Sequence, residues 1–307
     1  MQSDHPLVTI ILPVYNGEKT LGQTLESLLA QTFTNFEILI GIDGTTDDSK
    51  AIAESYSDKR IKIFENPVNL GLGPNVNKLI GEADSQSNYL AMAEQDDIYV
   101  KERLGWQVDY LNTNKNVGLI TGIAEFISDF NRVQFPGILV KGNQFPQGED
   151  LFKYLYINQL KVVNTCMMWR KDVHINNQLE FTDRYPNMNV DWDYILRFSL
   201  VSEIHGLHKV LVYMNRKLDN RSVTTDKSVQ FETSRKLLND FKHEFPQLVS
   251  RSTYSKALKV HRKIELGHKS KLGIILFSLY YFVRYFDPYF IKYIVLRISK
   301  YRNKSNT

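Results

Sequence analysis

The sequence predicts an α/β fold in which a mainly parallel sheet carries helices on both faces. Short β-branched runs such as VTIIL alternate with segments whose leucines recur at helical spacing, and the alternation continues through residue 214. Acidic residues also stand where apolar runs stop: Asp43 ends FEILIGID, Asp96 follows NYLAMAEQ, and Asp191 opens DWDYILRFSL. Since ligands of open α/β sheets bind beyond the carboxyl ends of the strands, these acids predict one shared crevice.

The predicted elements follow one another from the N-terminus. Strands are expected at residues 8–12, 36–42, 61–64, 89–93, 118–123, 162–169 and 210–214. The first helix is expected around Leu21, Leu25, Leu28 and Leu29, and further helices at residues 47–56, 74–83, 101–111, 150–158 and 191–201. Residues 126–148 are rich in Gly, Pro, Asn and Gln with weak periodicity, so they are predicted to be an inserted loop region over a site.

Composition places the chain among globular proteins. Its 307 residues are 43% hydrophobic and 23% charged, which is enough for one substantial core with residues left over. The single cysteine, Cys166, excludes a disulfide framework and a cysteine-rich metal site. The first ten residues show no secretory signal, so we expect a cytoplasmic protein.

Charge separates the C-terminal region from the rest. From Arg251 to the end there are 13 Lys and Arg against 2 acids, a balance of +11, whereas the preceding 250 residues hold 25 basic and 32 acidic residues, a balance of −7. The apolar run LGIILFSLYYFV has 12 residues, short of the roughly 20 that a spanning helix needs. We therefore expect residues 226–307 to be a helical, basic, amphipathic region on a membrane surface. The alternative is a pair of helices that close the core or form a dimer contact. No nucleic-acid-binding module is recognisable.

Four strings, in this order and spacing, resemble family 2 glycosyltransferases. They are VTIILPVYNGEKTLGQTLESLLAQTFTNFEILIGIDGTTDD, NLGLGPNVNK, AEQDDIYVKERL and, more loosely, DWDYILR. The resemblance covers roughly residues 8–216 and implies a GT-A catalytic domain over residues 1–225, followed by the helical extension. It also implies an inverting sugar transfer from a nucleotide-diphosphate donor, a UDP-sugar first and a dTDP-sugar next, to a glycan or lipid-linked acceptor in bacterial surface polysaccharide synthesis.

The resemblance assigns the nucleotide to the ends of the first two strands. It implies that Pro13 and Tyr15 line the base pocket and that Asp43 accepts hydrogen bonds from the nucleobase. The alternative is that Asp43 only starts a turn, and Asp47 is expected to cap the next helix. Asn77 lies in the segment that the family places near the diphosphate. Because Val76 stands where an arginine is common, a cation for the phosphates would come from Lys78, Arg216 or Arg221.

The family's metal motif, acid, any residue, acid, reads Glu94, Gln95, Asp96, with Asp97 behind it. A diphosphate bound to Mg²⁺ or Mn²⁺ needs hard oxygen ligands, so Asp96 is the first expected ligand. Glu94 replaces the more usual aspartate and is the second, directly or through water. The alternative is that these acids cap the helix that begins near residue 101.

The resemblance makes Asp191 the general base that takes the proton from the acceptor hydroxyl. The alternative is that Asp191 is only a helix N-cap. Arg197 is expected on a different face of that helix. Four departures from the family pattern, Ile42, Val76, Glu94 and Val190, keep a catalytically decayed scaffold open as a rival. Nucleotidyl transfer is a second rival, although it would show a glycine-rich, basic loop after the first strand, and PVYNGEKT is not one.

Overall fold

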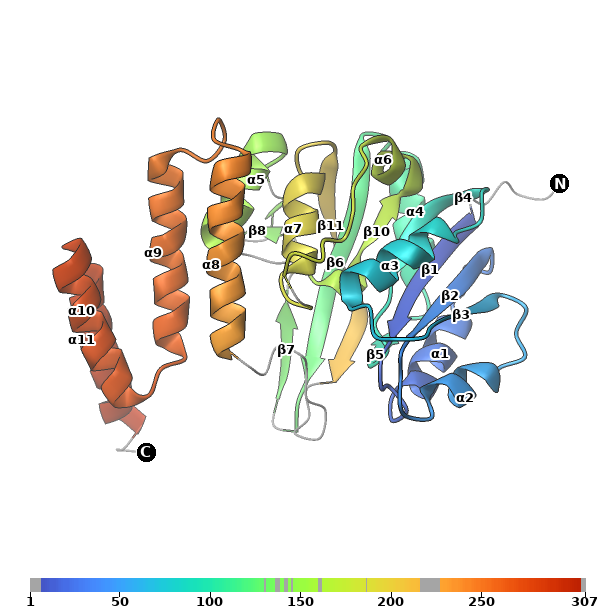
Figure 1. Ribbon diagram of the computed structural model, residues 1–307, viewed down its shortest axis with the longest axis horizontal. Coiled ribbons are helices and arrows are strands. Elements are labelled where there is room, and N and C mark those ends of the chain that lie inside the picture. The colour runs from blue at the N-terminus through green and yellow to red at the C-terminus, as the bar shows by residue number, and fades with distance from the viewer. Residues whose placement is uncertain are drawn as a thin grey trace. The chain divides into compact units, whose positions relative to one another are not determined.

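A computed structural model describes residues 7–129, 131–135, 139–140, 143–144, 146–159, 162–185, 187–215 and 227–304. The chain divides into two compact units. Unit 1 comprises Met1–Tyr156 and Leu160–Asp226, and unit 2 comprises Ile157–Gln159 and Lys227–Thr307. Unit 1 contains the sheet and unit 2 is helical (Figure 1).

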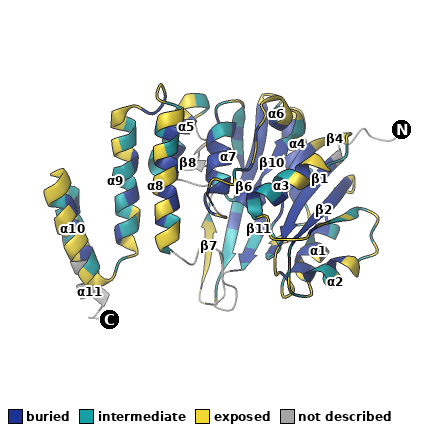
Figure 2. Ribbon diagram, viewed as in Figure 1, coloured by how far each residue is buried: buried dark blue, intermediate teal, exposed yellow. Residues whose placement is uncertain are grey.

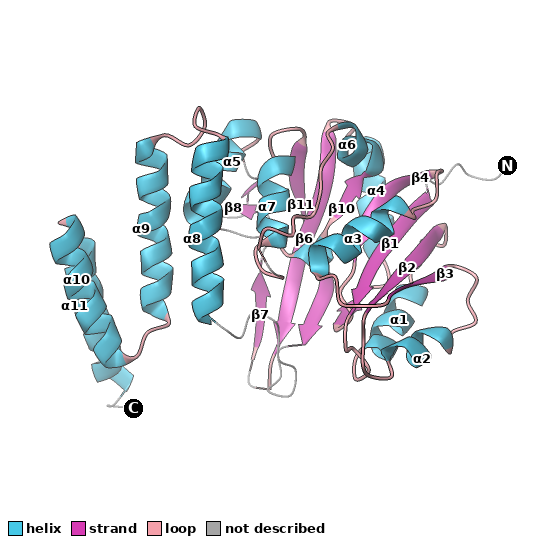
Figure 3. Ribbon diagram, viewed as in Figure 1, coloured by secondary structure: helices cyan, strands magenta, loops and turns pink. Residues whose placement is uncertain are grey.

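The first half of unit 1 is a parallel sheet. Its strands are β1 (Leu7–Val14), β2 (Phe36–Asp43), β3 (Ile61–Asn66) and β4 (Ser87–Met92), in the spatial order β3-β2-β1-β4. Every residue of β2 is buried, as expected for a parallel strand that is covered on both faces. The four strands confirm the predictions for this half of the chain. Because these strands are parallel, the carboxyl ends of β1, β2 and β4 lie at the same end of the sheet (Figure 3).

The sheet continues with strands of mixed direction. Its further strands are β5 (Asp97–Tyr99), β6 (Val117–Ile127), β7 (Arg132–Phe135), β10 (Met168–Arg170) and β11 (Glu203–Asn215). Strand β10 is antiparallel to both β4 and β6, and β11 is parallel to β6 but antiparallel to β5. Within the described residues the sheet has nine strands in the order β3-β2-β1-β4-β10-β6-β11-β5, with β7 added beside β6.

Helices cover both faces of this sheet. One core cluster joins β1, β2 and β6 to α1 (Leu21–Leu29), α2 (Ser49–Glu54) and α4 (Arg103–Thr113), through residues such as Leu25 and Val108. Helix α3 (Leu72–Gly81) contacts β1 and β2 and crosses in front of them in Figure 1, and α7 (Val190–Phe198) also lies on this near side. Figure 2 shows the strands as the most deeply buried part of unit 1. The mainly parallel sheet with helices on both faces is therefore confirmed.

Two predictions for the middle of the chain are wrong. Residues 162–169 do not form one strand, because η1 (Asn164–Cys166) is a 3₁₀ turn and β10 starts only at Met168. Residues 126–148 are more than a loop, since β6 extends to Ile127 and β7, β8 (Leu139–Val140) and β9 (Asn143–Gln144) follow. Helices α5 (Gly148–Asn158) and α6 (Lys171–Asn176) complete this part of the chain, and α6 was not predicted.

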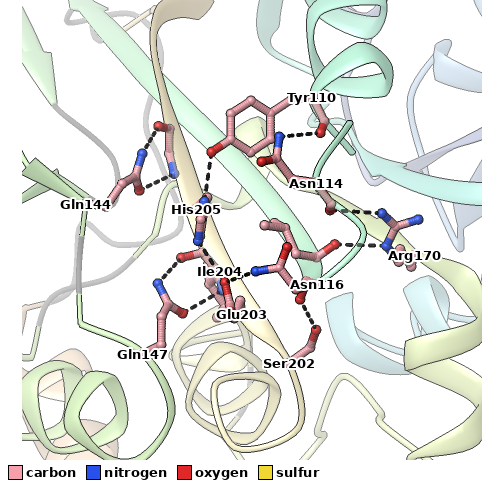
Figure 4. A network of polar contacts seen from close by, with 12 residues as sticks. Tyr110, Asn114, Asn116, Gln144, Gln147, Arg170, Ser202, Glu203, Ile204 and His205 are labelled. Carbon is pink, nitrogen blue, oxygen red and sulfur yellow. Dashed lines mark hydrogen bonds and ion pairs between the residues drawn. The ribbon is translucent and has the colours of Figure 1, made fainter. Parts of the chain in front are cut away.

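Two glutamines from the inserted segment complete the free side of β11 (Figure 4). Gln147 exchanges hydrogen bonds of 3.0 Å in both directions with the backbone of Ile204. Gln144 does the same with the backbone of Gly206, at 2.7 and 3.0 Å. The side-chain amides take the positions that a neighbouring strand would fill, so the backbone groups of the sheet edge are satisfied.

Unit 2 consists of four helices in the described residues: α8 (Lys227–Glu244), α9 (Arg251–Gly267), α10 (Lys271–Tyr285) and α11 (Tyr289–Lys304). A small apolar cluster of Leu266, Tyr281 and Phe290 joins α9, α10 and α11. His261 of α9 is buried, and its Nδ1 lies 3.0 Å from Gln159 Oε1. None of the described helices combines the length and the apolar character needed to cross a bilayer.

Candidate functional site

The turn after β1 is fastened to the loop after β2. The Asn16 N–H donates to Thr45 Oγ1 at 3.0 Å, and the Gly17 N–H donates to Ser49 Oγ at 2.7 Å. Pro13 is buried at the end of β1, where it pairs with Gly41, whereas the Tyr15 side chain is 48% exposed at the start of the turn. The predicted base-pocket residues therefore sit on a fixed turn, with one aromatic ring open to solvent.

Asp47 holds both sides of this junction. Its carboxylate accepts hydrogen bonds from the Glu18 N–H at 2.9 Å and from the Ser49 N–H at 3.0 Å, and also from two hydroxyls. Partial burial disfavours the carboxylate, but the hydrogen bonds from Ser49, Thr45 and Glu18 outweigh it and lower the pKa of Asp47 to about 2. Asp47 thus binds the first residue of α2, but the N-cap position belongs to Asp48, so the prediction that Asp47 caps this helix is wrong.

Asp43 is buried at the end of β2 and folds the next loop over the strand. Its Oδ1 accepts from Asn66 Nδ2 and from the Leu70 N–H, both at 2.9 Å, and its Oδ2 accepts from the Gly71 N–H at 3.0 Å. The alternative of a local turn is therefore incomplete, because Asp43 fixes a segment 27 residues further along the chain. Three donors therefore hold this carboxylate, which is only 3% exposed.

Three carboxylates gather just after β4. Oxygen atoms of Glu94, Asp96 and Asp97 all lie within 4.8 Å of one another, a spacing that can hold a metal ion. The set consists of hard oxygen donors and leaves open positions for waters or phosphate oxygens, which fits Mg²⁺ or Mn²⁺. The helix-cap alternative is wrong, because α4 begins only at Arg103, its N-cap residue is Glu102, and no side-chain cap bond is made there.

A fully buried arginine, Arg103, binds the backbone just before the acidic motif. Arg103 Nη2 donates to the carbonyls of Met92, at 2.8 Å, and Met167, at 3.2 Å, and its guanidinium stacks 4.6 Å from the centre of the Tyr99 ring. Burial lowers the pKa of Arg103, and the nearby Tyr99 and Asp97 oppose this effect. The Tyr99 hydroxyl in turn accepts from the Glu94 N–H at 2.8 Å. Arg103 was not recognised from the sequence, although it stands in the KERL string that follows the motif.

Asp191 stands in the first turn of α7. The helix starts at Val190 and its N-cap is Asn189, in a left-handed conformation with φ 57°, so the alternative that Asp191 is the cap is wrong. The Asp191 side chain is partly exposed, and it makes no hydrogen bond or ion pair with any residue that the structure describes. The segment before α7 reaches the loop that Asp43 holds, since the Leu72 N–H donates to Asn187 Oδ1 at 2.8 Å.

Of the other five residues singled out from the sequence, the structure describes Asn77, Lys78 and Arg197. Asn77 exchanges two hydrogen bonds of 2.9 Å with the backbone of Phe181 and lines a pocket of about 450 Å³ together with Asp193 and Arg197. Arg197 pairs with the buried Asp193 at 2.8 Å, on a different face of α7 from Asp191, as expected. Lys78 donates to Asn66 Oδ1 at 2.6 Å. The candidate cations Arg216 and Arg221 lie outside the described residues.

The comparison with known families fits this arrangement of strand ends and acids. The model of "Glycosyl transferase family 2" matches residues 9–176, which is more than half of the chain. The chain belongs to glycosyl transferase family 2. The matched region contains most of β1, all of β2 to β4, the turn at Tyr15, Asp43 and the acidic motif, and it ends before Asp191.

Relatives of this family 2 member come from several bacteria. It is 30% identical over 209 residues to an uncharacterized glycosyltransferase, RP339, of Rickettsia prowazekii, covering 67% of this chain and 63% of that one. It is 29% identical over 188 residues to the putative glycosyltransferase EpsE of Bacillus subtilis, covering 57% of this chain and 66% of EpsE. It is 25% identical over 240 residues to the Escherichia coli UDP-Glc:alpha-D-GlcNAc-diphosphoundecaprenol beta-1,3-glucosyltransferase WfgD, covering 78% and 87%. The chain thus spans less than two thirds of the length of several curated relatives it matches.

Solved structures share the fold of this family 2 member. S. aureus TarS 1-349 superposes with a TM-score of 0.64 at 18% identity, covering 86% of this chain and 74% of that one. The mannosyltransferase PcManGT from Pyrobaculum calidifontis, in complex with GDP-Man and Mn²⁺, gives a TM-score of 0.55 at 11% identity, covering 95% and 84%. The predicted GT-A fold is confirmed by these neighbours.

Proposed function

We propose that this protein is an inverting glycosyltransferase that moves a sugar from a nucleoside-diphosphate donor to a hydroxyl of a glycan or lipid-linked acceptor. The observation that carries the proposal is the acidic motif Glu94, Asp96, Asp97 at the end of β4, beside the Tyr15 turn on the adjacent β1, in a chain of family 2. A UDP-sugar is the favoured donor and a dTDP-sugar the next, because TarS structures contain UDP or UDP-GlcNAc and WfgD is named for UDP-Glc.

The nucleobase and the diphosphate of the donor are assigned to different residues of the site. The nucleobase lies against Tyr15 and Pro13, and Asp43 accepts a hydrogen bond from its imide edge. The diphosphate lies toward Asp96 and Glu94, the residues that would hold Mg²⁺ or Mn²⁺, and such a cation would offset the negative charge that develops on the leaving diphosphate. Asn77 contributes indirectly through the loop that it holds at Phe181.

The transfer step needs one base. The acceptor oxygen forms a bond to the anomeric carbon while the bond from that carbon to the diphosphate oxygen breaks, and the nucleoside diphosphate leaves. The acceptor's proton passes to the Asp191 carboxylate, which is partly exposed and makes no ion pair with a described residue. Attack on the face opposite the leaving group inverts the anomeric centre.

Unit 2 supports a location on the inner face of the cell membrane. The outer side of α10 is apolar and exposed, with Leu272 and Val283 both 66% exposed. The buried residues Ile274, Ser278 and Tyr281 occupy the opposite side. The helix is bounded by Lys271 and Arg284 within a tail of net charge +11. Apolar side chains flanked by cations fit a surface of anionic lipids, where a lipid-linked acceptor would also lie.

Incubation with a panel of nucleotide sugars tests the function. The wild-type protein is expected to transfer or hydrolyse one of them, and Asp191→Asn is expected to lose about 10²–10⁴-fold in kcat while it still binds the nucleoside diphosphate. Asp109→Asn, on exposed α4 surface, is the matched control and keeps full turnover. Turnover by Asp191→Asn at the wild-type rate would remove Asp191 from the role of base. Absence of turnover and of nucleotide binding in the wild type would contradict the proposed function.

A further inference from the structure

The middle residue of the acidic motif reaches the nucleotide turn. Gln95 lies between Glu94 and Asp96 in the sequence, and its side-chain amide pairs with the backbone of Tyr15 in both directions. The Tyr15 N–H donates to Gln95 Oε1 at 2.8 Å, and Gln95 Nε2 donates to Tyr15 O at 2.9 Å. These two antiparallel hydrogen bonds fix both the distance and the relative orientation of the Gln95 amide and the Tyr15 backbone.

The surroundings are shaped for this contact. A Cβ atom at Gly17 would lie 2.6 Å from Gln95 Oε1 and 2.7 Å from its Cδ, so only glycine leaves room for the amide. On the other side, the Gln95 carbonyl accepts from Thr24 Oγ1 at 2.8 Å, and the same hydroxyl lies 2.9 Å from the Asp97 carbonyl. Helix α1 therefore holds the backbone of the acidic motif while the Gln95 side chain holds the turn.

We propose that Gln95 is a positioning residue that sets the distance between the nucleobase pocket and the metal motif. This role rests on the proposed function, because a nucleoside diphosphate is the ligand that spans both places. The base binds at Tyr15 and the diphosphate at Asp96, so the ligand gains from both only when their separation matches its length. The base pocket and the metal motif can each form without the hydrogen bonds between Gln95 and Tyr15, but binding of the whole donor requires these bonds.

The test compares the whole ligand with one of its halves. Gln95→Met keeps the length of the side chain and removes both hydrogen bonds, and Gln23→Met, an exposed residue of α1, is the matched control. Affinity for Mn²⁺ alone, from paramagnetic resonance, is expected to stay within about twofold, whereas affinity for UDP in the presence of Mn²⁺, from titration calorimetry, falls about tenfold for the loss of two ordinary hydrogen bonds. In turnover, the donor KM rises by a similar factor and kcat at saturating donor is retained.

Gly17→Ala gives a second route to the same change, since it displaces the Gln95 amide without altering the acidic motif. It is expected to reproduce the loss of UDP affinity with unchanged Mn²⁺ affinity. Equal UDP affinity in the wild type and Gln95→Met overturns the role of Gln95 alone. An equal loss of Mn²⁺ and UDP affinity also overturns it, because the damage then lies in the metal motif. A wild-type protein that binds no nucleoside diphosphate overturns the proposed function and this role with it.

Discussion

The two units of this protein differ in which side chains depart from the usual pattern of apolar residues inside and polar residues outside. In unit 1 the unusual groups are polar and held in place: Asp43 and Arg103 are buried and bound by backbone groups from segments distant in sequence. In unit 2 they are apolar and exposed, and α10 alone presents Leu272, Leu276 and Val283 with more than half of each side chain accessible. A buried charge costs free energy unless hydrogen bonds compensate it, as they do for Arg103, whereas a contiguous exposed apolar face indicates a contact surface.

The difference teaches how each unit is built. Unit 1 has a large apolar core, which leaves stability available for a buried arginine and a group of carboxylates. Among the residues whose burial the structure describes, the apolar cluster that joins α9, α10 and α11 has three buried members, Leu266, Tyr281 and Phe290. A helix such as α10, apolar on nearly all sides, is expected to find its remaining contacts outside the protein.

Loss of the buried charge in unit 1 is expected to have the largest effect. Arg103→Met leaves the carbonyls of Met92 and Met167 without their buried donor, and it should lower the free energy of unfolding by about 3–5 kcal/mol, because each unsatisfied buried acceptor costs about 1–3 kcal/mol. Arg262→Met in unit 2 is the matched comparison, because Arg262 is only partly buried and stacks 3.9 Å from the Tyr285 ring. Its cost is expected to be about 1 kcal/mol. Denaturant unfolding measures the loss of unfolding free energy in both variants. Equal losses would contradict the expected difference between the two units.

A buried histidine in unit 1 gives the next largest effect. Burial lowers the pKa of His174 from 6.5 to about 4, and its Nδ1 lies 2.9 Å from the Tyr194 hydroxyl. Between these values the unfolded chain binds a proton that the folded chain does not. The contribution of neutral, buried His174 to the free energy of unfolding is therefore complete above pH 6.5. It is lost as the pH falls toward 4, by at most about 3 kcal/mol. Unfolding at pH 7.5 and 5.0 should show less pH dependence in His174→Gln than in the wild type, and His208→Gln, an exposed control, should match the wild type.

His261 extends this test to unit 2. Burial, followed by the charges of Arg235 and Arg262, lowers its pKa to about 4 as well. The sign of the pH effect is the same, so acid should weaken both units. An unchanged pH profile in both His174→Gln and His261→Gln would contradict the neutral, buried state of these rings.

The exposed face of α10 gives a smaller but more specific effect. Leu276→Asp should weaken binding to vesicles that contain anionic lipid by about tenfold, the value of one large apolar side chain removed from the bilayer interface. Val229→Asp, on an exposed position of α8, is the control and should bind as the wild type does. Added salt should weaken binding of all three proteins. Cosedimentation measures this, and retained binding by Leu276→Asp would show that α10 does not contact lipid.

Local pattern was enough to predict much of unit 1. The runs that became β1, β2 and β4 are long, apolar and bounded by turn residues, and Asp43 and Asp96 stand at or after the ends of two strands that both run parallel to β1. The shared crevice of these acids with Asp191 stays a prediction. Pattern failed at residues 162–169, where an equally apolar run contains Asn164 and Thr165. These polar residues support Glu94 and Tyr99, so the chain turns there and pairs only from Met168 onward.

Other features depend on partners that a single segment does not contain. Arg103 is buried because carbonyls from two distant segments accept its hydrogen bonds, and an arginine near a helix start otherwise predicts a solvated surface. Gln95 occupies the variable position of its motif, and its contact with Tyr15 depends on β1 and β4 being neighbours. Such residues are found only once the strand order is known.

The most direct test of the central claim is calorimetric titration of UDP, with and without Mn²⁺, into the wild-type protein and Asp96→Asn. The wild type should bind UDP more tightly with Mn²⁺ than without it, because Glu94, Asp96 and Asp97 would hold a cation that offsets the charge of the diphosphate. Asp96→Asn should keep the UDP affinity measured without Mn²⁺ and lose the gain in affinity that Mn²⁺ gives the wild type. The same Mn²⁺ increment in both proteins would contradict a metal-dependent donor site at this edge of the sheet.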